Sequence, residues 1–551
     1  MNARKKYCKI ISLLIILVMA FGLFATGCSS KGDDQAPNQN ADQKPNDNEA
    51  SEGTEEEVEF TYPMEGNKTL TYWCDLNTNV SANYTNLADT PLYQEVFKRT
   101  GVTIEFQHPA AGQAEEQLNL ILASGELPDI IEYNWYAFPG GPEKAIQDGY
   151  ILELSDVLDK YAPNLTRYLK ENPEIDKQVK TDESHYYVFP FIRGADLLLI
   201  SSGPIIRKDW LDDLGLGIPE TMEEWYVALK KFKDEKGATA PLTYEAYMLD
   251  WGVFTGAYGV KRGFYVEDGQ VKFGDIEPGF KEFLAEYSKW YAEGLIDRDI
   301  ATVDTKQIAA KMTGGQSGAS LGWAASRLGS WMQTVTPTNP EYELVGAPYP
   351  VLEKGETPKF GNYEFPYSKT GSAAITTACK DVEAAARFLD YAYSEEGHML
   401  FNFGIEGESY NMVDGQPKYA DKLYNDPDGR PLNQTLAAYV RANYNGPFIQ
   451  DERYLPQYQA LSQQMEAIET WVKTDAEKYL LPPITPTPEE SQEFATIMNE
   501  INTYKEEMFL KFLFGDASLD EFDEYVNTIK SMGIDRAIEI QQNALDRYNN
   551  R

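Results

Sequence analysis

The fold is decided by residues 69–106, which read TLTYWCDLNTNVSANYTNLADTPLYQEVFKRTGVTIEF. A short β-prone run, LTYW, opens this stretch, and an alternating strand, VTIEF, closes it. Between them lies a helix that begins at Pro91, with Thr90 as its N-cap, and ends before Gly101. Two strands joined through a helix predict the right-handed β-α-β unit of a parallel sheet.

The same alternation continues downstream. A helix is predicted over residues 113–124, ending before Gly125, and the next strand begins with LPDII at 127–131. This β-α-β-α-β order predicts an α/β layer fold. Ligands of such folds lie at the carboxyl ends of the strands. Side chains directly after predicted strands are therefore the first candidates for a functional site.

The composition is that of a large, acidic, aromatic-rich protein. The chain has 551 residues, with 87 Asp and Glu against 49 Lys and Arg, a formal charge of −38 and a mean hydropathy of −0.47. So negative a surface repels phosphate backbones, and we expect no nucleic-acid partner. The hydropathy excludes a polytopic membrane protein. With three His and four Cys, the chain has little room for a His/Cys zinc site.

Residues 1–27 are predicted to be an export signal. Arg4, Lys5 and Lys6 form a positive start, and an apolar run follows over 10–24, which ends in small residues before Cys28. The run of about 15 residues is short for a membrane-spanning helix, which needs ~20, although an uncleaved anchor helix is the alternative. The pattern resembles a bacterial lipobox, with Ala25 where leucine is commonest. By that resemblance Cys28 becomes the lipidated first residue of the mature chain, anchored by two acyl chains.

Residues 28–65 are expected to form a disordered acidic and polar tether, because they contain too few large apolar side chains to offset the entropy of ordering. Loss of the signal removes four basic residues and no acidic ones, so the formal charge falls from −38 to −42. Two cysteines then remain in the globular part, Cys74 and Cys379. They either pair in an oxidising compartment or lie as separate buried thiols, and we expect buried thiols.

Several longer motifs resemble one protein family. In chain order they are LTYW, LPDII, GYILELSDVLDKYAPNL, HYYVFP, IIRKDWLDDLGLGIPETMEEWYVALKKF, YAEGLID, EAAARFLDYAYSEEG, FGIEGESY and KFLFGDASLDEFDEYVNTIKSMGIDRAIEIQQNALDRY. They resemble the family-1 extracellular solute-binding lipoproteins of ABC sugar importers, in the large type of roughly 500 residues that binds oligosaccharides. The resemblance runs from about residue 66 to 550.

This resemblance implies a two-lobed α/β fold of the periplasmic-binding-protein type (type II), with a ligand cleft between the lobes and a hinge. We expect an N-terminal lobe made of residues 66–200 and 351–445, and a C-terminal lobe made of 201–350 and 446–551. The implied partners are an oligosaccharide, the permease subunits of an ABC transporter, and the outer face of the cell membrane through Cys28. We expect the chain to act as a monomer.

Enzymatic chemistry finds little support in the residues. Glu406 and Glu408 are two residues apart in an acidic loop, and nothing sets the opposed ~5–9 Å geometry that glycoside hydrolysis requires. The three histidines show no metal spacing. Asp426 and Asp428 fit a Pro-Asp-Gly turn better than a calcium loop, which would need twelve residues and a terminal Glu. No catalytic residue, cofactor or metal site is predicted.

Sugar binding requires aromatic rings that stack on the C–H face of a pyranose, with planar polar side chains around its hydroxyls. Such residues are expected just after strand ends or at helix N-termini, and four places qualify. They are the end of the LPDII strand, a Gly-rich aromatic stretch around Trp251, the short strand that ends at Trp323, and the GIEGESY loop. The resemblance adds weight to Trp323, which matches the position where sugar-binding relatives stack a ring. The predicted ligand-binding residues are Asn134, Trp135, Tyr136, Trp251, Trp323, Arg327, Glu408 and Tyr410.

Two alternative functions remain at this stage. A binding protein for a peptide or another non-sugar solute would need pockets for charged termini rather than stacked rings. An extracellular carbohydrate-active enzyme would share the export signal and the aromatic residues. The order of the family motifs favours the solute-binding protein.

Overall fold

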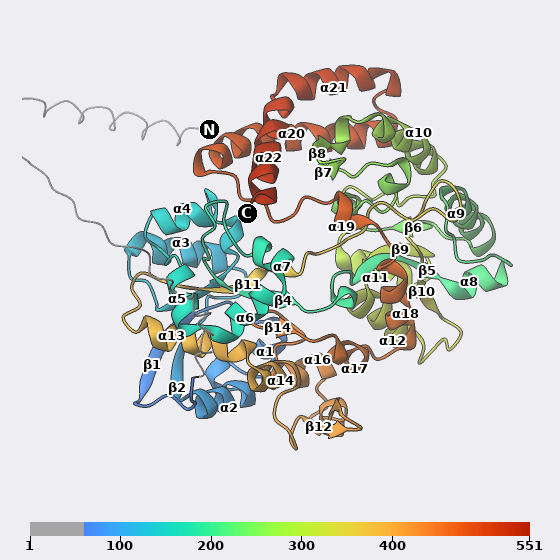
Figure 1. Ribbon diagram of the computed structural model, residues 1–551. Helices are drawn as coiled ribbons and strands as arrows, with labels where there is room; N and C mark the ends of the chain where they lie inside the picture. The colour runs from blue at the N-terminus through green and yellow to red at the C-terminus, as the bar shows by residue number, and fades with distance from the viewer. Residues whose placement is uncertain (1–59) are drawn as a thin grey trace, which may run out of the picture. The chain divides into compact units, whose positions relative to one another are not determined.

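The computed structural model describes residues 60–551. The export signal, the lipidation site at Cys28 and most of the tether lie outside the described residues. The remaining chain contains two central sheets with separate cores, and we call these parts the first lobe and the second lobe (Figure 1).

The first lobe is built on a six-stranded sheet in the order β14-β4-β11-β3-β1-β2. Its strands are β1 (Lys68–Trp73), β2 (Val102–Gln107), β3 (Ile130–Tyr133), β4 (Phe189–Arg193), β11 (Tyr367–Ile375) and β14 (Ile449–Gln450). β1, β2 and β3 are parallel, as the β-α-β pattern predicts. β11 is antiparallel to both of its neighbours, so the sheet is mixed rather than purely parallel.

Helices pack against the first sheet and share its core. They are α1 (Thr78–Ser81), α2 (Pro91–Thr100), α3 (Ala114–Ser124), α4 (Gly141–Gln147), α5 (Ser155–Tyr161), α6 (Pro163–Glu171), α7 (Pro173–Gln178), α13 (Val382–Asp390) and α14 (Glu395–Phe403). The predicted start and end of α2 are confirmed: the Thr90 side chain accepts a hydrogen bond from Tyr93 N, and Gly101 adopts the left-handed conformation that ends the helix.

The second lobe is built on a four-stranded sheet in the order β10-β5-β9-β6. Its strands are β5 (Ser202–Arg207), β6 (Leu242–Thr243), β9 (Ala319–Trp323) and β10 (Leu344–Gly346). The helices around it are α8 (Lys208–Asp213), α9 (Met222–Lys236), α10 (Pro278–Ala292), α11 (Thr305–Thr313), α12 (Ser330–Val335) and α18 (Ser462–Trp471). Tryptophans on helical faces fill this core, and Trp225, Trp290 and Trp471 are fully buried.

Three C-terminal helices extend the second core. They are α20 (Pro488–Phe514), α21 (Phe522–Ser531) and α22 (Ile534–Asn549). Figure 1 shows α20 beside α10, and α22 beside the hairpin of β7 (Phe264–Glu267) and β8 (Gln270–Phe273). Apolar side chains of all three helices belong to the same buried cluster as β9.

The stretch between residues 400 and 450 differs from the expected division of the lobes. Leu400 and Phe448 pack in the first core, whereas Phe403 and Leu436 pack in the second. β14 then joins the first sheet, although we expected residues 446–551 in the second lobe. The short elements of this region are β12 (Tyr410–Val413), β13 (Gln416–Tyr419), α15 (Asp421–Tyr424), α16 (Leu432–Ala437), α17 (Leu455–Tyr458) and, further on, α19 (Ala476–Tyr479).

The two cysteines of the described chain, Cys74 and Cys379, are buried free thiols, so that prediction is confirmed. Burial raises the pKa of the Cys379 thiol to about 12 and that of Cys74 well above its usual range, which keeps both protonated and unreactive. Among the helices of residues 60–551, none has the length and apolar character needed to cross a membrane.

Candidate functional site

Trp323 is the last residue of β9 in the second sheet. It is half-buried, and its backbone pairs with Ser202 at the start of β5. The chain then turns through a π-helical segment, Ala324–Gly329. Single π-turns are frequent at functional sites because they reorient side chains within a short distance. At this strand end Trp323 is partly exposed.

Trp251 stands edge-on to Trp323. The two ring centroids are 5.3 Å apart, with an angle of 75° between the ring planes. Trp251 is 8% exposed and belongs to the second core, so its ring is fixed by packing. The T-shaped pair is a favourable arrangement of the two quadrupoles, and it holds the more open Trp323 ring in place.

Arg327 supports this pair from inside the lobe. Its Nη2 donates to both carboxylate oxygens of Glu245 at 2.6 Å, and its Nη1 donates to the Leu321 carbonyl at 2.8 Å. The guanidinium carbon lies 5.7 Å from the centre of the Trp323 ring. Arg327 is buried and already paired, so it caps a neighbouring carboxylate instead of standing free for an acidic ligand.

Gly322 makes room for the Arg327 side chain. A Cβ atom at position 322 would lie 2.1 Å from Arg327 Cδ, far inside van der Waals contact. Any larger residue here would displace the arginine. The glycine before Trp323 is therefore required by the packing of the site.

Asp250 links the Trp251 segment to a buried charge network. Its Oδ1 lies 3.5 Å from Arg262 Nη1, and within the described chain neither atom has a hydrogen-bond partner. Arg262 is paired with Asp275 at 3.3 Å and with Glu506 of α20 at 2.6 Å. Burial raises the pKa of the Asp250 carboxyl, although the nearby guanidinium opposes the shift.

Two further residues of this site escaped the sequence patterns. Glu245 follows β6, and besides Arg327 it accepts a hydrogen bond from Thr305 Oγ1 at 2.7 Å. Tyr247 lies two residues further on and is 55% exposed, which is unusual for a large aromatic side chain. Both follow a strand end, the criterion applied elsewhere. β6 has only two residues, however, and so short a strand leaves no alternation to recognise.

The first sheet presents a different picture after β3. Trp135 is only 1% exposed, and its Nε1 donates to the Ile131 carbonyl at 3.1 Å. It packs in the core with no ring face open to a ligand. The Asn134 side chain caps the short turn Trp135–Ala137 by accepting from Ala137 N at 3.3 Å. Both residues therefore stabilise the turn after β3, Trp135 by packing and Asn134 by capping.

The same strand end is held by a buried ion pair. Glu132 Oε1 accepts from Arg441 Nη2 at 2.6 Å, and Glu132 Oε2 accepts from the Tyr72 hydroxyl at 2.8 Å. Tyr136, further along, donates from its hydroxyl to the Ile484 carbonyl at 2.5 Å. Lys369 Nζ lies over the Tyr136 ring, 4.0 Å from its centre, so a lysine already occupies one face of that ring.

The GIEGESY loop forms a turn beside the β12–β13 hairpin. Glu408 is exposed, and its carboxylate accepts from Lys422 at 3.3 Å and from the Tyr439 hydroxyl at 3.0 Å. Tyr410 is buried against Phe403, with 6.0 Å between the ring centres. Of the eight residues expected at the ligand site, the structure brings Trp251, Trp323 and Arg327 into contact. The others lie after β3 or in this loop.

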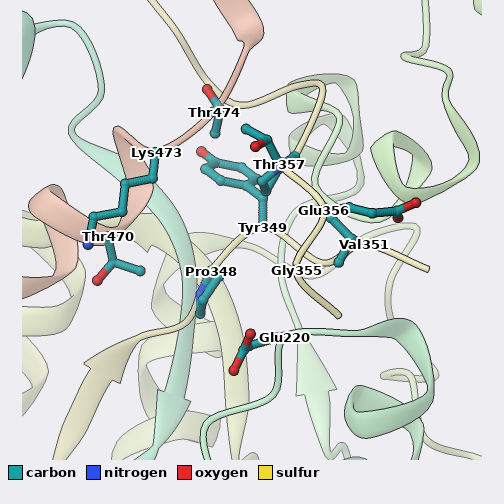
Figure 2. Close-up of a pocket in the computed structure, with 11 residues that line it drawn as sticks. Glu220, Pro348, Tyr349, Val351, Gly355, Glu356, Thr357, Thr470, Lys473 and Thr474 are labelled. Carbon is teal, nitrogen blue, oxygen red and sulfur yellow. The ribbon is translucent and has the colours of Figure 1, made fainter. Parts of the chain in front are cut away.

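A separate hollow of about 480 Å³ lies in the second lobe, and Figure 2 shows it around Tyr349. The Tyr349 hydroxyl donates to the Ser202 carbonyl at 2.7 Å, and the residue is 2% exposed, so its ring offers little stacking surface. The lining residues are Glu220, Pro348, Tyr349, Val351, Gly355, Glu356, Thr357, Pro358, Thr470, Lys473 and Thr474. The Trp251–Trp323 pair is the stronger candidate because it combines an open ring with fixed polar groups.

Metal ligation has no support in the part of the chain that the structure describes, where no group of three or more His, Cys, Asp or Glu side chains is placed to hold an ion. Asp426 instead accepts hydrogen bonds from Asp428 N at 2.9 Å and from the Arg430 guanidinium at 2.7 Å. This is the turn that the Pro-Asp-Gly sequence predicts.

Comparison with known proteins gives the family. The model of the bacterial extracellular solute-binding proteins matches residues 82–399, which is more than half of the chain. The chain belongs to this family.

Curated relatives of this solute-binding protein have similar lengths. It is 24% identical to the fructooligosaccharide ABC transporter substrate-binding protein FusA of Streptococcus pneumoniae, over 89% of this chain and 92% of the relative. It is 23% identical to the polygalacturonan/rhamnogalacturonan-binding protein YtcQ of Bacillus subtilis, over 80% and 85%. It is also 28% identical to the lipoprotein LipO of Bacillus subtilis, over 59% and 65%.

Solved structures share the fold of the solute-binding protein. The alginate-binding protein AlgQ2 superposes with a TM-score of 0.68 at 25% identity, over 89% of this chain and all of that one. An HMO-binding solute-binding protein of an ABC transporter from Bifidobacterium longum infantis gives 0.73 at 20% identity, over 88% and 99%. The predicted two-lobed α/β fold of the periplasmic-binding-protein type is therefore confirmed.

The packing of Gly322 against Arg327 makes a prediction about stability. Gly322→Ala is expected to lower the free energy of unfolding by about 1–3 kcal/mol, because the added methyl overpacks the buried arginine. Chemical denaturation measures the change. Gly217→Ala is the matched control, since a Cβ there meets nothing within 4 Å, and it should stay within about 0.5 kcal/mol. Equal stability of the two variants would contradict this account of the site.

Proposed function

We propose that this protein captures an oligosaccharide outside the cell membrane and delivers it to an ABC importer without changing it chemically. The observation that carries the proposal is the half-buried Trp323 ring at the end of β9, set edge-on against Trp251. A pyranose presents an apolar C–H face to such a ring. Tyr247 adds a second exposed aromatic side chain two residues from Glu245.

The relatives support a binding role. FusA is named for fructooligosaccharides and YtcQ for polygalacturonan and rhamnogalacturonan, and each covers most of this chain. Membership of the solute-binding family supports capture rather than catalysis. The lobes would close over the sugar by hinge motion, as in other two-lobed binding proteins, and the closed monomer would dock on the permease subunits.

We further propose that the ligand is neutral. Arg327 is the cation beside the Trp251–Trp323 pair, and both of its Nη groups are occupied by Glu245 and the Leu321 carbonyl. An acidic sugar would have to displace a buried carboxylate from its guanidinium, which is costly. The formal charge of −38 also disfavours long-range attraction of an anion.

The anchor is proposed from the sequence. Cys28 follows a short apolar run and lies outside the described residues, and the similarity to the lipoprotein LipO supports lipidation. A diacylated Cys28 would hold the protein at the outer face of the cell membrane.

A ligand panel tests the main proposal. Neutral oligosaccharides, including kestose, are compared with oligogalacturonides and a peptide pool in thermal unfolding of the protein. A ligand at 100 times its Kd should stabilise the folded state by about 2.7 kcal/mol. We expect the shift from a neutral sugar. A shift from peptides alone would refute sugar binding, a shift from acidic sugars alone would refute neutrality, and new products after incubation would indicate an enzyme.

Trp323→Ala tests the site itself. Loss of ring stacking should weaken binding of the responding sugar by about 1–3 kcal/mol, which is roughly a fivefold to 150-fold rise in Kd measured by calorimetry. Tyr424→Ala is the control, because Tyr424 is also an exposed aromatic residue but lies on α15. Unchanged affinity in folded Trp323→Ala would show that Trp323 serves packing and does not bind the sugar.

Cys28→Ala tests the anchor. In cells given radiolabelled palmitate, the wild-type protein should incorporate label and sediment with membranes, whereas the variant should do neither. Labelled variant protein would contradict lipidation at Cys28.

A further inference from the structure

We propose that the C-terminal end of the chain forms a latch that holds the first lobe and restricts its movement against the second. The latch consists of Asp182 in the first lobe and Thr485, Arg547 and Arg551 near the C-terminus. It does not depend on which solute the protein binds.

Asp182 is the centre of the latch, and both of its carboxylate oxygens are occupied. Oδ2 accepts from Arg547 Nε at 2.5 Å, and Oδ1 accepts from Arg551 Nη2 at 2.5 Å. Thr485 Oγ1 donates to Oδ1 at 3.0 Å, while the Asp182 backbone N–H donates to the same hydroxyl at 3.1 Å. Four hydrogen bonds therefore converge on one residue of the loop between α7 and β4.

Arg551 also donates hydrogen bonds to the backbone of this loop. Its Nη1 donates to the carbonyl oxygens of Lys177 at 2.9 Å and Lys180 at 2.5 Å. Its Nη2 also donates to Thr485 Oγ1 at 2.6 Å. Arg551 therefore binds the backbone carbonyls of this loop as well as its charged side chain.

Burial makes these contacts strong. The Arg551 side chain is 1% exposed and the Asp182 side chain 7%, whereas the Arg547 side chain is 30% exposed. Water has little access to the Asp182–Arg551 pair, so removing one of these two charges leaves the other buried and uncompensated. Exposed ion pairs, by contrast, contribute little. We therefore expect the Asp182–Arg551 pair to resist separation of the loop from the C-terminal residues more than an exposed ion pair would.

The two sides of the latch belong to different cores. The loop that carries Asp182 leads into β4 of the first sheet. Arg547 lies on α22, whose Ile534 and Ala537 pack in the second core. Gln542 of the same helix accepts a hydrogen bond from Val271 N of β8 at 2.8 Å. The start of α22 thus packs in the second lobe, and the end of α22 contacts the first lobe through Arg547.

Helix α20 strengthens the second-lobe side. Glu490, in its first turn, accepts from Arg547 Nη2 at 2.6 Å, so one arginine joins Glu490 and Asp182. Further along the helix, Glu506 pairs with the buried Arg262 of the second lobe at 2.6 Å. The arginine that holds the first lobe is thereby bonded to a helix that packs in the second core.

Covalent crossings between the two sheets occur three times, from β4 to β5, from β10 to β11, and after β14. The latch adds a non-covalent link to these three, beside the contact between α20 and α4. Residues 480–487 run alongside it, and the Ile484 carbonyl accepts the Tyr136 hydroxyl directly after β3. A movement that separates this loop from α22 must break these bonds or pull α22 from the second core.

The experiment measures lobe movement directly, without ligand. In the full chain, Lys98 of α2 and Lys230 of α9, both exposed, are replaced by a ketone amino acid that carries a nitroxide, and the distance distribution between the two labels is recorded by pulsed electron resonance. This chemistry leaves the cysteines unlabelled. Asp182→Asn and Thr485→Val each weaken the latch with almost no change of shape.

The matched control is Arg536→Ala. Arg536 lies on α22 and pairs with Glu493 of α20 at 2.8 Å, but both side chains are well exposed, so this pair joins two helices of the same lobe. We expect Asp182→Asn and Thr485→Val to broaden the distance distribution or add a second population, and Arg536→Ala to match the wild type.

Distributions identical to the wild type in folded Asp182→Asn and Thr485→Val would overturn the proposal. Equal broadening in Arg536→Ala would also overturn it, because the effect would then come from the helices alone. If Asp182→Asn shows no cooperative unfolding, the milder Thr485→Val decides. Because no sugar is present, a failed ligand panel and a failed latch are distinguishable.

Discussion

The charge of Arg327 is buried, and the structure tolerates it because Glu245 accepts two hydrogen bonds from it at 2.6 Å. This pair joins the chain after β6 to the π-helical turn after β9. It fixes the backbone on both sides of the Trp251–Trp323 contact, and Gly322 exists as glycine to leave space for it. The open ring of Trp323 thus depends on a buried ion pair for its position.

Similar pairs occur at two other places where segments far apart in the sequence meet. Glu132 and Arg441 join β3 to the region that returns from the second core, and Asp182 with Arg547 joins the first lobe to α22. Removing one partner of a buried pair is strongly destabilising. Hydrophobic contacts, by contrast, are not directional and do not fix one relative position of two surfaces. Buried pairs are therefore suited to fixing the register between lobes that must move as units.

The local elements of the fold could be predicted from the sequence. The α2 helix begins after Thr90 and ends at Gly101 because capping is decided by side chains within a few residues. The antiparallel direction of β11 could not be predicted, since it depends on where the chain re-enters from the second lobe. The split of residues 400–450 between two cores has the same origin, since the core that each short element joins is set by tertiary packing.

By itself, the sequence determined the α/β class, the family resemblance, and Trp323 as a ring at a strand end. Only the tertiary structure decided that Arg327 is neutralised by Glu245, that Trp135 is buried, and that Asp182 receives two arginines from the last turn of the chain. The partner of a charge is chosen by three-dimensional proximity, and no local pattern of residues records it.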